Sequence, residues 1–234
     1  MTPRGLPEAL TAEAGTANGE MAAADPFAAD YRHPPETLAL ALGRALARLG
    51  EEDAVSLPLL GVRARRRLIG ATAHLTFRPA TPVIGEGEDA VHQDFDLCMS
   101  FPELSLFHAF AGALGRLVDA SLAGLDPAPL ARPFRFNDLV VQRYPKGSFG
   151  ITAHRDHTRY QGLVALVTLA GTARFFVCAE RRGRRAREVP CPPGDLLLMR
   201  APGFAGRRDR PFHYLGDVTQ ARLALGLRHD LRAE

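Results

Sequence analysis

The sequence contains no tryptophan, a single lysine among its 234 residues, and only three cysteines. The cysteines, Cys98, Cys178 and Cys191, are odd in number and far apart, which favours a reducing cytoplasm over a disulfide framework or a zinc cage. No run of 18 apolar residues is present, so we expect no membrane-spanning helix and no membrane partner. The first residues also lack the continuous apolar segment of a secretory signal. These absences together predict a cytoplasmic protein.

Three common catalytic signatures are missing as well: the Gly-rich phosphate loop, the Gly-x-Ser-x-Gly elbow and the Cys-x-x-Cys pair. The composition, 46% hydrophobic and 24% charged, is typical of one globular domain. The charge is uneven, because residues 1–60 carry a net charge of −5 and residues 61–234 carry +8. The basic part is compatible with a polyanionic partner. Arginines spread over a solvated surface are an equally good explanation.

The pattern along the chain predicts a leader followed by one domain. Residues 1–34 show no sustained apolar face, and we interpret them as a flexible leader. Residues 35–133 follow as helices and a lid loop, and residues 134–234 form the core of the same domain, residues 35–234. Four elements are expected before this core: helices over Glu36–Leu49 and Glu103–Leu125, a strand over Gly70–Arg78 and a long loop over Pro79–Phe95.

From Phe134 onward, short apolar segments alternate with turn residues, a pattern typical of β-strands. Eight strands are expected, over Asp138–Tyr144, Phe149–Ala153, Leu163–Leu169, Ala173–Ala179, Arg187–Val189, Asp195–Arg200, Pro211–Leu215 and Gln220–Arg228. Eight strands preceded by two helices predict a mainly β protein of the α+β class, in which a β-sandwich or small barrel is backed by helices.

The segment His154-Arg155-Asp156 is the first chemical signal. On a strand, residues i and i+2 point to the same side, so this imidazole and this carboxylate face the same way. With one more histidine they complete the two-His, one-carboxylate set that leaves open positions on Fe(II); His213 follows 59 residues later, near another strand. A second copy, His92-Gln93-Asp94, lies in the Gly- and Glu-rich loop without a comparable arginine strand after its next histidine. We favour the first copy and interpret the second as a structural or lid feature.

In the last expected strand, Gln220–Arg228, large apolar side chains alternate with arginines and small residues. One face carries Leu223, Leu225 and Leu227, and the other carries Arg222, Ala224, Gly226 and Arg228. Two guanidinium groups on a face otherwise free of bulk predict an anion site in a barrel mouth. Arginine suits such a site because it donates two parallel hydrogen bonds to a carboxylate.

With these residues, Pro133–Arg228 resembles the Fe(II)/2-oxoglutarate-dependent oxygenases, and in detail their AlkB-like branch. The matching stretches are Phe134-Arg135-Phe136-Asn137 with Leu139, Tyr144 with Gly147-Ser148, Ile151, His154-x-Asp156, Leu169–Gly171 with Arg174 and Phe175, Gly194-Asp195, His213 and Arg222-x5-Arg228. The resemblance covers roughly the last 100 residues. It implies a double-stranded β-helix, a jelly-roll core.

The resemblance also implies a role for particular residues. The iron ligands would be His154, Asp156 and His213. Arg222 would pair with the distal carboxylate of 2-oxoglutarate, and Tyr144 would donate a hydrogen bond to the same cosubstrate. Arg228 would hold the near end of 2-oxoglutarate or the ligand Asp156. Gln142 stands where the branch usually has asparagine, and we count it with the cosubstrate-binding residues.

The sequence departs from the branch at two further places. Ala224 and Gly226 replace the usual polar pair between the two arginines, and His157 and Thr158 replace acidic residues that often follow the ligand aspartate. With these departures, binding of Fe(II), 2-oxoglutarate and O2 is still expected, whereas the usual alkylated-base substrate is less well supported and is kept as an alternative.

Three functions follow as hypotheses. The first is a dioxygenase that hydroxylates or oxidatively demethylates a substrate while it releases succinate and CO2. The second is an AlkB-type demethylase of alkylated nucleic acid. The third is a non-catalytic metal- or ligand-binding β-barrel. For the first, we favour a small or cationic substrate over nucleic acid, because the loop Pro79–Phe95 is acidic. The run Arg181–Arg187 is interpreted as a solvated hairpin tip, with phosphate contact as the alternative.

Overall fold

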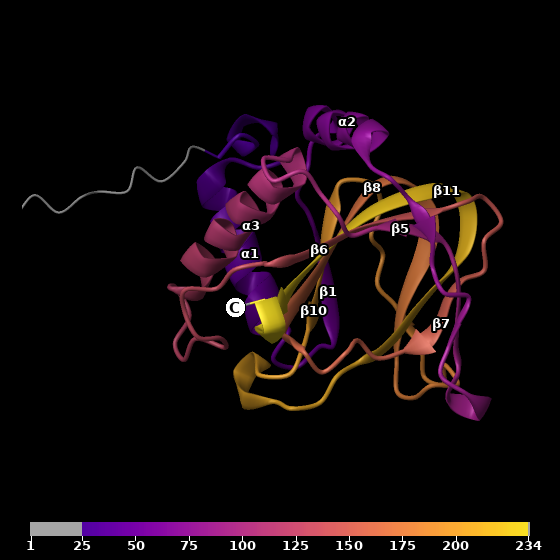
Figure 1. Cartoon of the computed structure of the whole chain (residues 1–234). Helices are drawn as coiled ribbons and strands as arrows, with labels where there is room; N and C mark the ends of the chain where they lie inside the picture. The colour runs from indigo at the N-terminus through magenta and orange to yellow at the C-terminus, as the bar shows by residue number, and fades with distance from the viewer. Residues whose placement is uncertain (1–24, 234) are drawn as a thin grey trace, which may run out of the picture.

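The computed structural model describes residues 25–233, and it places three helices beside a barrel of antiparallel strands (Figure 1). The helices are α1 (Pro35–Arg48), α2 (Val62–Ala71) and α3 (Leu106–Leu122). α1 begins at Pro35 because proline fits the first helical turn, where its missing N–H is not needed. α3 begins after Ser105, whose hydroxyl accepts the backbone N–H of His108. None of these helices has the length and apolar character needed to cross a membrane.

All strand pairs in this part of the chain are antiparallel. The strands are β1 (Ala54–Pro58), β2 (Arg78–Pro79), β3 (Val83–Ile84), β4 (Val91–Asp94), β5 (Asp96–Cys98), β6 (Asp138–Tyr144), β7 (Gly150–His154), β8 (Tyr160–Cys178), β9 (Arg187–Glu188), β10 (Asp195–Arg200) and β11 (Phe212–Asp230). The main path runs β1-β10-β8-β11-β6-β5-β2, while β7 pairs with both β11 and β4, and β9 pairs with β8. The predicted α+β class with a jelly-roll core is confirmed.

The two longest strands, β8 and β11, each replace two predicted strands. Gly171 was expected to lie in a turn, but it lies inside β8 with a φ of +80°. A Cβ atom there would overlap the carbonyl group of Ala221 on β11, so glycine lets the two strands bend together at this point. Register shifts in β11 between Gly216 and Ala224 accompany the bend. The chain therefore curves from one side of the barrel to the other without interruption.

The sheet is buried on both faces, as β10 shows. All six of its residues are buried. Leu196 and Leu198 pack into the layer formed with the helices, while Leu197 and Met199 belong to the barrel interior. The apolar run Leu196–Met199 of β10 is explained by this alternation, because each of its side chains faces one apolar layer or the other. β11 follows the same rule, with Leu225 in the helix-facing layer.

Two expectations for the first half of the chain are wrong. The predicted strand Gly70–Arg78 is the end of α2 followed by a short 3-10 turn (Thr72–His74), and only Arg78 begins a strand. α2 was missed because arginines occupy four of its ten positions, although Ala64 and Leu68 bury its inner face at a spacing of four residues. Three helices therefore precede the core instead of two. β1 was also missed.

The predicted loop Pro79–Phe95 contains β3, β4 and a 3-10 turn (Gly87–Asp89). The acidic end of this loop contacts the hairpin between β8 and β9. Arg181 Nε lies 2.8 Å from an Asp89 carboxylate oxygen, and Arg182 Nη2 lies 2.8 Å from one of Glu88. The hairpin arginines are therefore not simply solvated, because two of them pair with acidic residues of the loop.

The predicted leader is partly wrong. Residues 1–24 lie outside the described residues, but residues 25–34 pack against the domain. Phe27 is 0% exposed, and its ring lies edge-on to Phe110 of α3 with centroids 5.2 Å apart. Arg67 of α2 places its guanidinium 5.0 Å from the same ring. Tyr31 forms an isolated β-bridge with Leu60. The domain therefore begins before Pro35.

Replacing Phe27 with leucine should lower the free energy of unfolding by about 1–2 kcal/mol. The change keeps most of the buried volume but removes the aromatic pair and the cation–π contact. Chemical denaturation measures this difference. The matched control is Leu104→Ala, at a side chain that is 98% exposed, which should change stability by less than about 0.5 kcal/mol. Equal stability of Phe27→Leu and the wild type would contradict the packing of this segment.

Candidate metal centre and anion pocket

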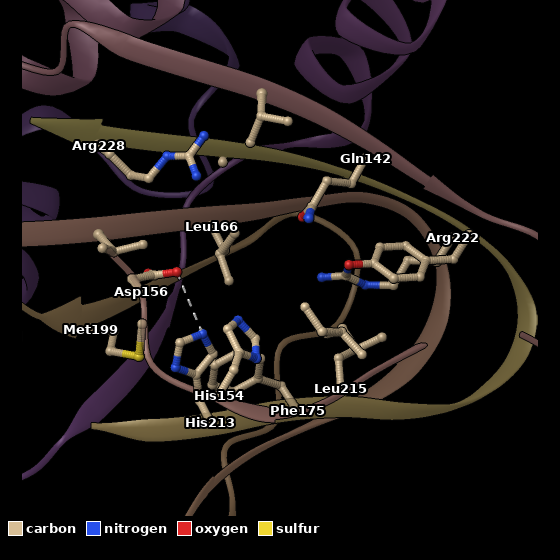
Figure 2. Close-up of a pocket in the computed structure, with 15 residues that line it drawn as sticks. Gln142, His154, Asp156, Leu166, Phe175, Met199, His213, Leu215, Arg222 and Arg228 are labelled. Atoms are coloured by element: carbon tan, nitrogen blue, oxygen red, sulfur yellow. Dashed lines mark ion pairs between the residues drawn. The ribbon is translucent and has the colours of Figure 1, made fainter. Parts of the chain in front are cut away.

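The barrel interior brings His154, Asp156 and His213 together. His154 ends β7 and pairs in register with His213 on β11, and Asp156 follows two residues later. One potential ligand atom from each side chain lies within 4.8 Å of the others, and His213 Nε2 lies 3.9 Å from Asp156 Oδ1 (Figure 2). His213 is buried and the other two are partly exposed. The structure thus collects the three residues proposed as ligands.

Backbone carbonyls fix the orientation of both imidazoles. His154 Nδ1 lies 2.9 Å from the carbonyl oxygen of Thr152, and His213 Nδ1 lies 3.3 Å from that of Pro211. A carbonyl oxygen only accepts, so each Nδ1 carries the proton and donates it. Each Nε2 is then left with a free lone pair, which is the form of histidine that binds a metal ion.

The electrostatics favour a neutral imidazole at His154 and an ionised carboxylate at Asp156. Burial, together with the nearby His213, lowers the pKa of His154 to about 4. Burial by itself raises the pKa of Asp156, but the charges of His213, His154 and Arg228 outweigh it and lower that pKa below its ordinary value. At neutral pH His154 is therefore uncharged and Asp156 is ionised. Such a donor set fits a divalent first-row metal ion.

Arg222 enters the same cavity from β11 and is 4% exposed. Its Nη2 donates to the hydroxyl of Thr168 over 3.2 Å, and its guanidinium lies 5.4 Å from the ring centre of Tyr144. Among residues 25–233, no carboxylate pairs with it. Burial lowers the pKa of Arg222 and raises the pKa of Tyr144 to about 12. A buried cation without an acidic partner is costly, so this end of the cavity is built for an anion.

Gln142 and Arg228 line the cavity as well. Figure 2 shows Arg222 on one side of it, Arg228 on the other, above Asp156 in this view, and Gln142 between them. Arg228 Nε lies 2.7 Å from a carboxylate oxygen of Asp138, so this guanidinium, unlike Arg222, has an acidic partner. The remaining wall is mainly apolar: Val140, Ile151, Val164, Leu166, Phe175, Met199, Leu215 and Gly226.

The second His-x-Asp pattern is separate from this cavity. His92 and Asp94 lie on β4, and the backbone N–H of His92 donates to Thr152 Oγ1 over 3.0 Å. Neither belongs to a metal-binding group among the described residues, and neither lines the cavity. Thr168, by contrast, was not singled out in the sequence, because a threonine inside an apolar strand carries no signal until its neighbour Arg222 is known.

The depressed pKa of His154 predicts how the metal-free protein responds to pH. Between the ordinary value of 6.5 and about 4, the unfolded chain binds a proton that the folded chain does not. The free energy of unfolding should therefore fall as the pH is lowered through this range. Denaturation in EDTA measures the slope, which His154→Asn should flatten and His157→Asn, at an exposed neighbour, should keep. An unchanged slope in His154→Asn would contradict the buried, neutral imidazole.

Comparison with known proteins gives a match in structure but not in sequence. No protein-family model matches the sequence, and no curated protein matches it. A prolyl-4-hydroxylase from Pseudomonas putida superposes with a TM-score of 0.58 at 17% identity, covering 81% of this chain and 98% of that protein. An oxidoreductase of the 2OG-Fe(II) oxygenase family from Burkholderia pseudomallei superposes with a TM-score of 0.53 at 16% identity, covering 81% of this chain and 92% of that protein.

A prolyl hydroxylase from Trichoplax adhaerens, solved with a peptide fragment of the hypoxia-inducible factor oxygen degradation domain, also superposes. Its TM-score is 0.52 at 10% identity, covering 85% of this chain and 93% of that protein. At such identities the likeness shows a shared fold, the jelly roll of 2OG-Fe(II) oxygenases.

Proposed function

We propose that the protein is an Fe(II)- and 2-oxoglutarate-dependent dioxygenase that hydroxylates or oxidatively demethylates a substrate. One observation carries this proposal. A single cavity holds a two-His, one-carboxylate group and, on another wall, the buried guanidinium of Arg222 without an acidic partner. A metal chelator with a distant carboxylate fits both features at once, and 2-oxoglutarate is such a molecule. The shared fold supports the same assignment.

The three side chains suit Fe(II) in number and type. Two Nε2 atoms and one carboxylate would hold the ion and would leave coordination positions open for the cosubstrate and O2. When bound, Fe(II) supplies the redox chemistry that couples oxidative decarboxylation of 2-oxoglutarate by O2 to oxidation of a substrate C–H bond. The carbonyls of Thr152 and Pro211 hold the two imidazoles in the ligating tautomer.

The other polar residues bind and orient. Arg222 receives the distal carboxylate of 2-oxoglutarate through parallel hydrogen bonds, and Tyr144 donates its hydroxyl proton to the same group, since its raised pKa keeps it protonated. Gln142, between the two arginines, is placed to donate to the cosubstrate. Arg228 forms an ion pair with Asp138, and its positive charge helps to lower the pKa of Asp156 and so favours the ionised carboxylate. The apolar wall excludes water, which strengthens each of these interactions.

The class of primary substrate is a further proposal. The preference for a small or cationic substrate rested on the acidic loop, but Arg181 and Arg182 neutralise Asp89 and Glu88 there. Repulsion of an anion by these two carboxylates is therefore weaker than the sequence suggested. A small molecule remains the proposed substrate, and AlkB-type demethylation of nucleic acid remains the alternative reaction. No contact among the described residues favours the alternative.

The test follows succinate and CO2 formation from 2-oxoglutarate in air, with and without added Fe(II). The proposal expects both products to form at equal rates, only with Fe(II), and to stop when a chelator is added. Turnover without a primary substrate is slow in this scheme, so the measurement needs high enzyme concentration. Binding of Fe(II) and 2-oxoglutarate with no succinate would instead identify a non-catalytic binding module. Methylated single-stranded DNA and RNA, added at two salt concentrations, test the nucleic acid alternative.

A further inference from the structure

The hydrogen bond that holds Arg222 comes from a neighbouring strand. Thr168 lies on β8, is 2% exposed, and accepts from Arg222 Nη2 over 3.2 Å. No other hydrogen-bond partner of this guanidinium is present among residues 25–233. A long side chain in an apolar cavity has several rotamers, and a single directional contact selects the one in which the guanidinium faces the cavity.

The direction of this contact is set by a third residue. A guanidinium only donates, so Thr168 Oγ1 must accept from it, and the threonine proton must go elsewhere. It goes to Cys191, whose sulfur lies 3.4 Å from Thr168 Oγ1 and 3.6 Å from the carbonyl oxygen of Asp195. Each group thus donates to the next, from the guanidinium through the hydroxyl and the thiol to a backbone carbonyl. Burial raises the pKa of Cys191, in keeping with a thiol that stays protonated.

The strand register explains why threonine occupies this position. Thr168 is the cross-strand partner of Ala224, two residues after Arg222 on β11, and residues paired in this way share one face of the sheet. Ala224 is fully buried and has no polar atom in its side chain. The hydroxyl that Ala224 cannot supply to the arginine beside it is therefore supplied from β8.

We propose that Thr168 is a positioning residue for the anion-binding arginine, with Cys191 as the acceptor that orients its hydroxyl. The proposal rests on the proposed function, in which Arg222 binds the distal carboxylate of 2-oxoglutarate. Thr168 acts through Arg222, so its loss affects cosubstrate binding and leaves the metal centre intact.

The first experiment measures the KM for 2-oxoglutarate, kcat and Fe(II) affinity of Thr168→Val. This variant keeps the shape of threonine and loses the hydroxyl. The KM should rise roughly 5- to 30-fold, which corresponds to about 1–2 kcal/mol, because the variant removes the one hydrogen bond that orients the guanidinium, while kcat and Fe(II) affinity stay within about twofold. Thr168→Ser should restore the KM. The matched control is Thr172→Val, which removes an exposed hydroxyl from the same strand.

The second experiment moves the hydroxyl across the strand pair. Thr168→Ala should raise the KM, and adding Ala224→Ser to it should lower the KM again, because a hydroxyl returns to the same face beside Arg222. Cys191→Ala should have a smaller effect than Thr168→Val, since it frees the hydroxyl to rotate without removing it. Thermal unfolding of each variant separates a folding defect from a binding defect.

The outcomes separate the two proposals. Wild-type protein that neither binds nor consumes 2-oxoglutarate would overturn the proposed function, and this inference with it. Wild-type turnover with an unchanged KM in Thr168→Val would overturn the positioning role alone. Equal losses of cosubstrate binding and Fe(II) affinity in Thr168→Val, without rescue by Thr168→Ser, would also overturn it, because they would indicate a structural role.

Discussion

Replacing Asp156 with alanine is expected to abolish Fe(II)-dependent turnover of 2-oxoglutarate, as are His154→Ala and His213→Ala. The group has three candidate ligands, and the described residues contain no fourth histidine, cysteine or carboxylate that joins it. Losing Asp156 removes the negative charge that balances a divalent ion, as well as one donor atom. Fe(II) affinity, measured under anaerobic conditions, should fall together with succinate release.

The matched control for this prediction is Asp94→Ala, in the second His-x-Asp pattern. Asp94 lies on β4, outside the cavity, so its variant should keep both Fe(II) affinity and turnover. Retained turnover in Asp156→Ala with loss in Asp94→Ala would show that the metal centre has been assigned to the wrong pattern. Asp156→Asn adds a finer test, because it keeps the size and an oxygen donor while it removes the charge.

Much of the site could be predicted because strand geometry is periodic. A period of two sorted Arg222 and Arg228 from the leucines of β11. It also predicted that His154 and Asp156 face the same way, and the cavity contains all four residues although Asp156 lies two residues beyond the end of β7. These inferences needed only the local pattern. The position of His213 could not be predicted from a local pattern, because a separation of 59 residues in the sequence does not say how far apart two side chains lie in the fold. The resemblance to known oxygenases supplied it, and the register His213↔His154 now gives the physical reason for it.

The parts that sequence reasoning missed depend on contacts between distant segments. Gly171 reads as a turn, yet the approach of Ala221 makes it a bend inside one strand. Phe27 lies in a segment of low apolar content, and its burial depends on Phe110, which is 83 residues away. The role of Thr168 likewise depends on Arg222, 54 residues away, to which it is hydrogen-bonded. Local propensity cannot supply such information, since it concerns pairs that only the fold brings together.

The charged segments of the chain also depend on contacts between distant residues. The acidic residues of the loop and the basic residues of the β8–β9 hairpin were each read as isolated runs, with opposite consequences for a partner. In the structure Asp89 pairs with Arg181 and Glu88 with Arg182, so part of the charge of each run is offset by the other. A net charge read from a segment describes a surface only when its neighbours in space are known. Arg222 is the opposite case, because no carboxylate in the described part of the chain offsets its charge.

Replacing Arg222 with methionine is expected to raise the KM for 2-oxoglutarate at least about 100-fold, the effect of losing two charged hydrogen bonds. Arg222→Lys should weaken the binding of 2-oxoglutarate by about 1–3 kcal/mol, because one ammonium cannot reproduce two parallel hydrogen bonds to a carboxylate. Initial rates of succinate release over a range of 2-oxoglutarate concentrations measure both effects. An unchanged KM in Arg222→Lys beside a large change in Arg228→Lys would reassign the anchor.

The same methionine variant should also be more stable than the wild type when no ligand is bound. Arg222 is buried, and none of the described carboxylates pairs with it, so removing its charge relieves a desolvation cost. Replacing it with an apolar side chain should raise the free energy of unfolding by about 1–3 kcal/mol. 2-Oxoglutarate with a divalent metal should raise the melting temperature of the wild type and have little effect on Arg222→Met. Arg228→Met is the contrasting control, because it leaves Asp138 without its cation and should destabilise the fold. A less stable Arg222→Met protein would show that this guanidinium holds the barrel together, and it would remove the main argument that the pocket is built for an anion.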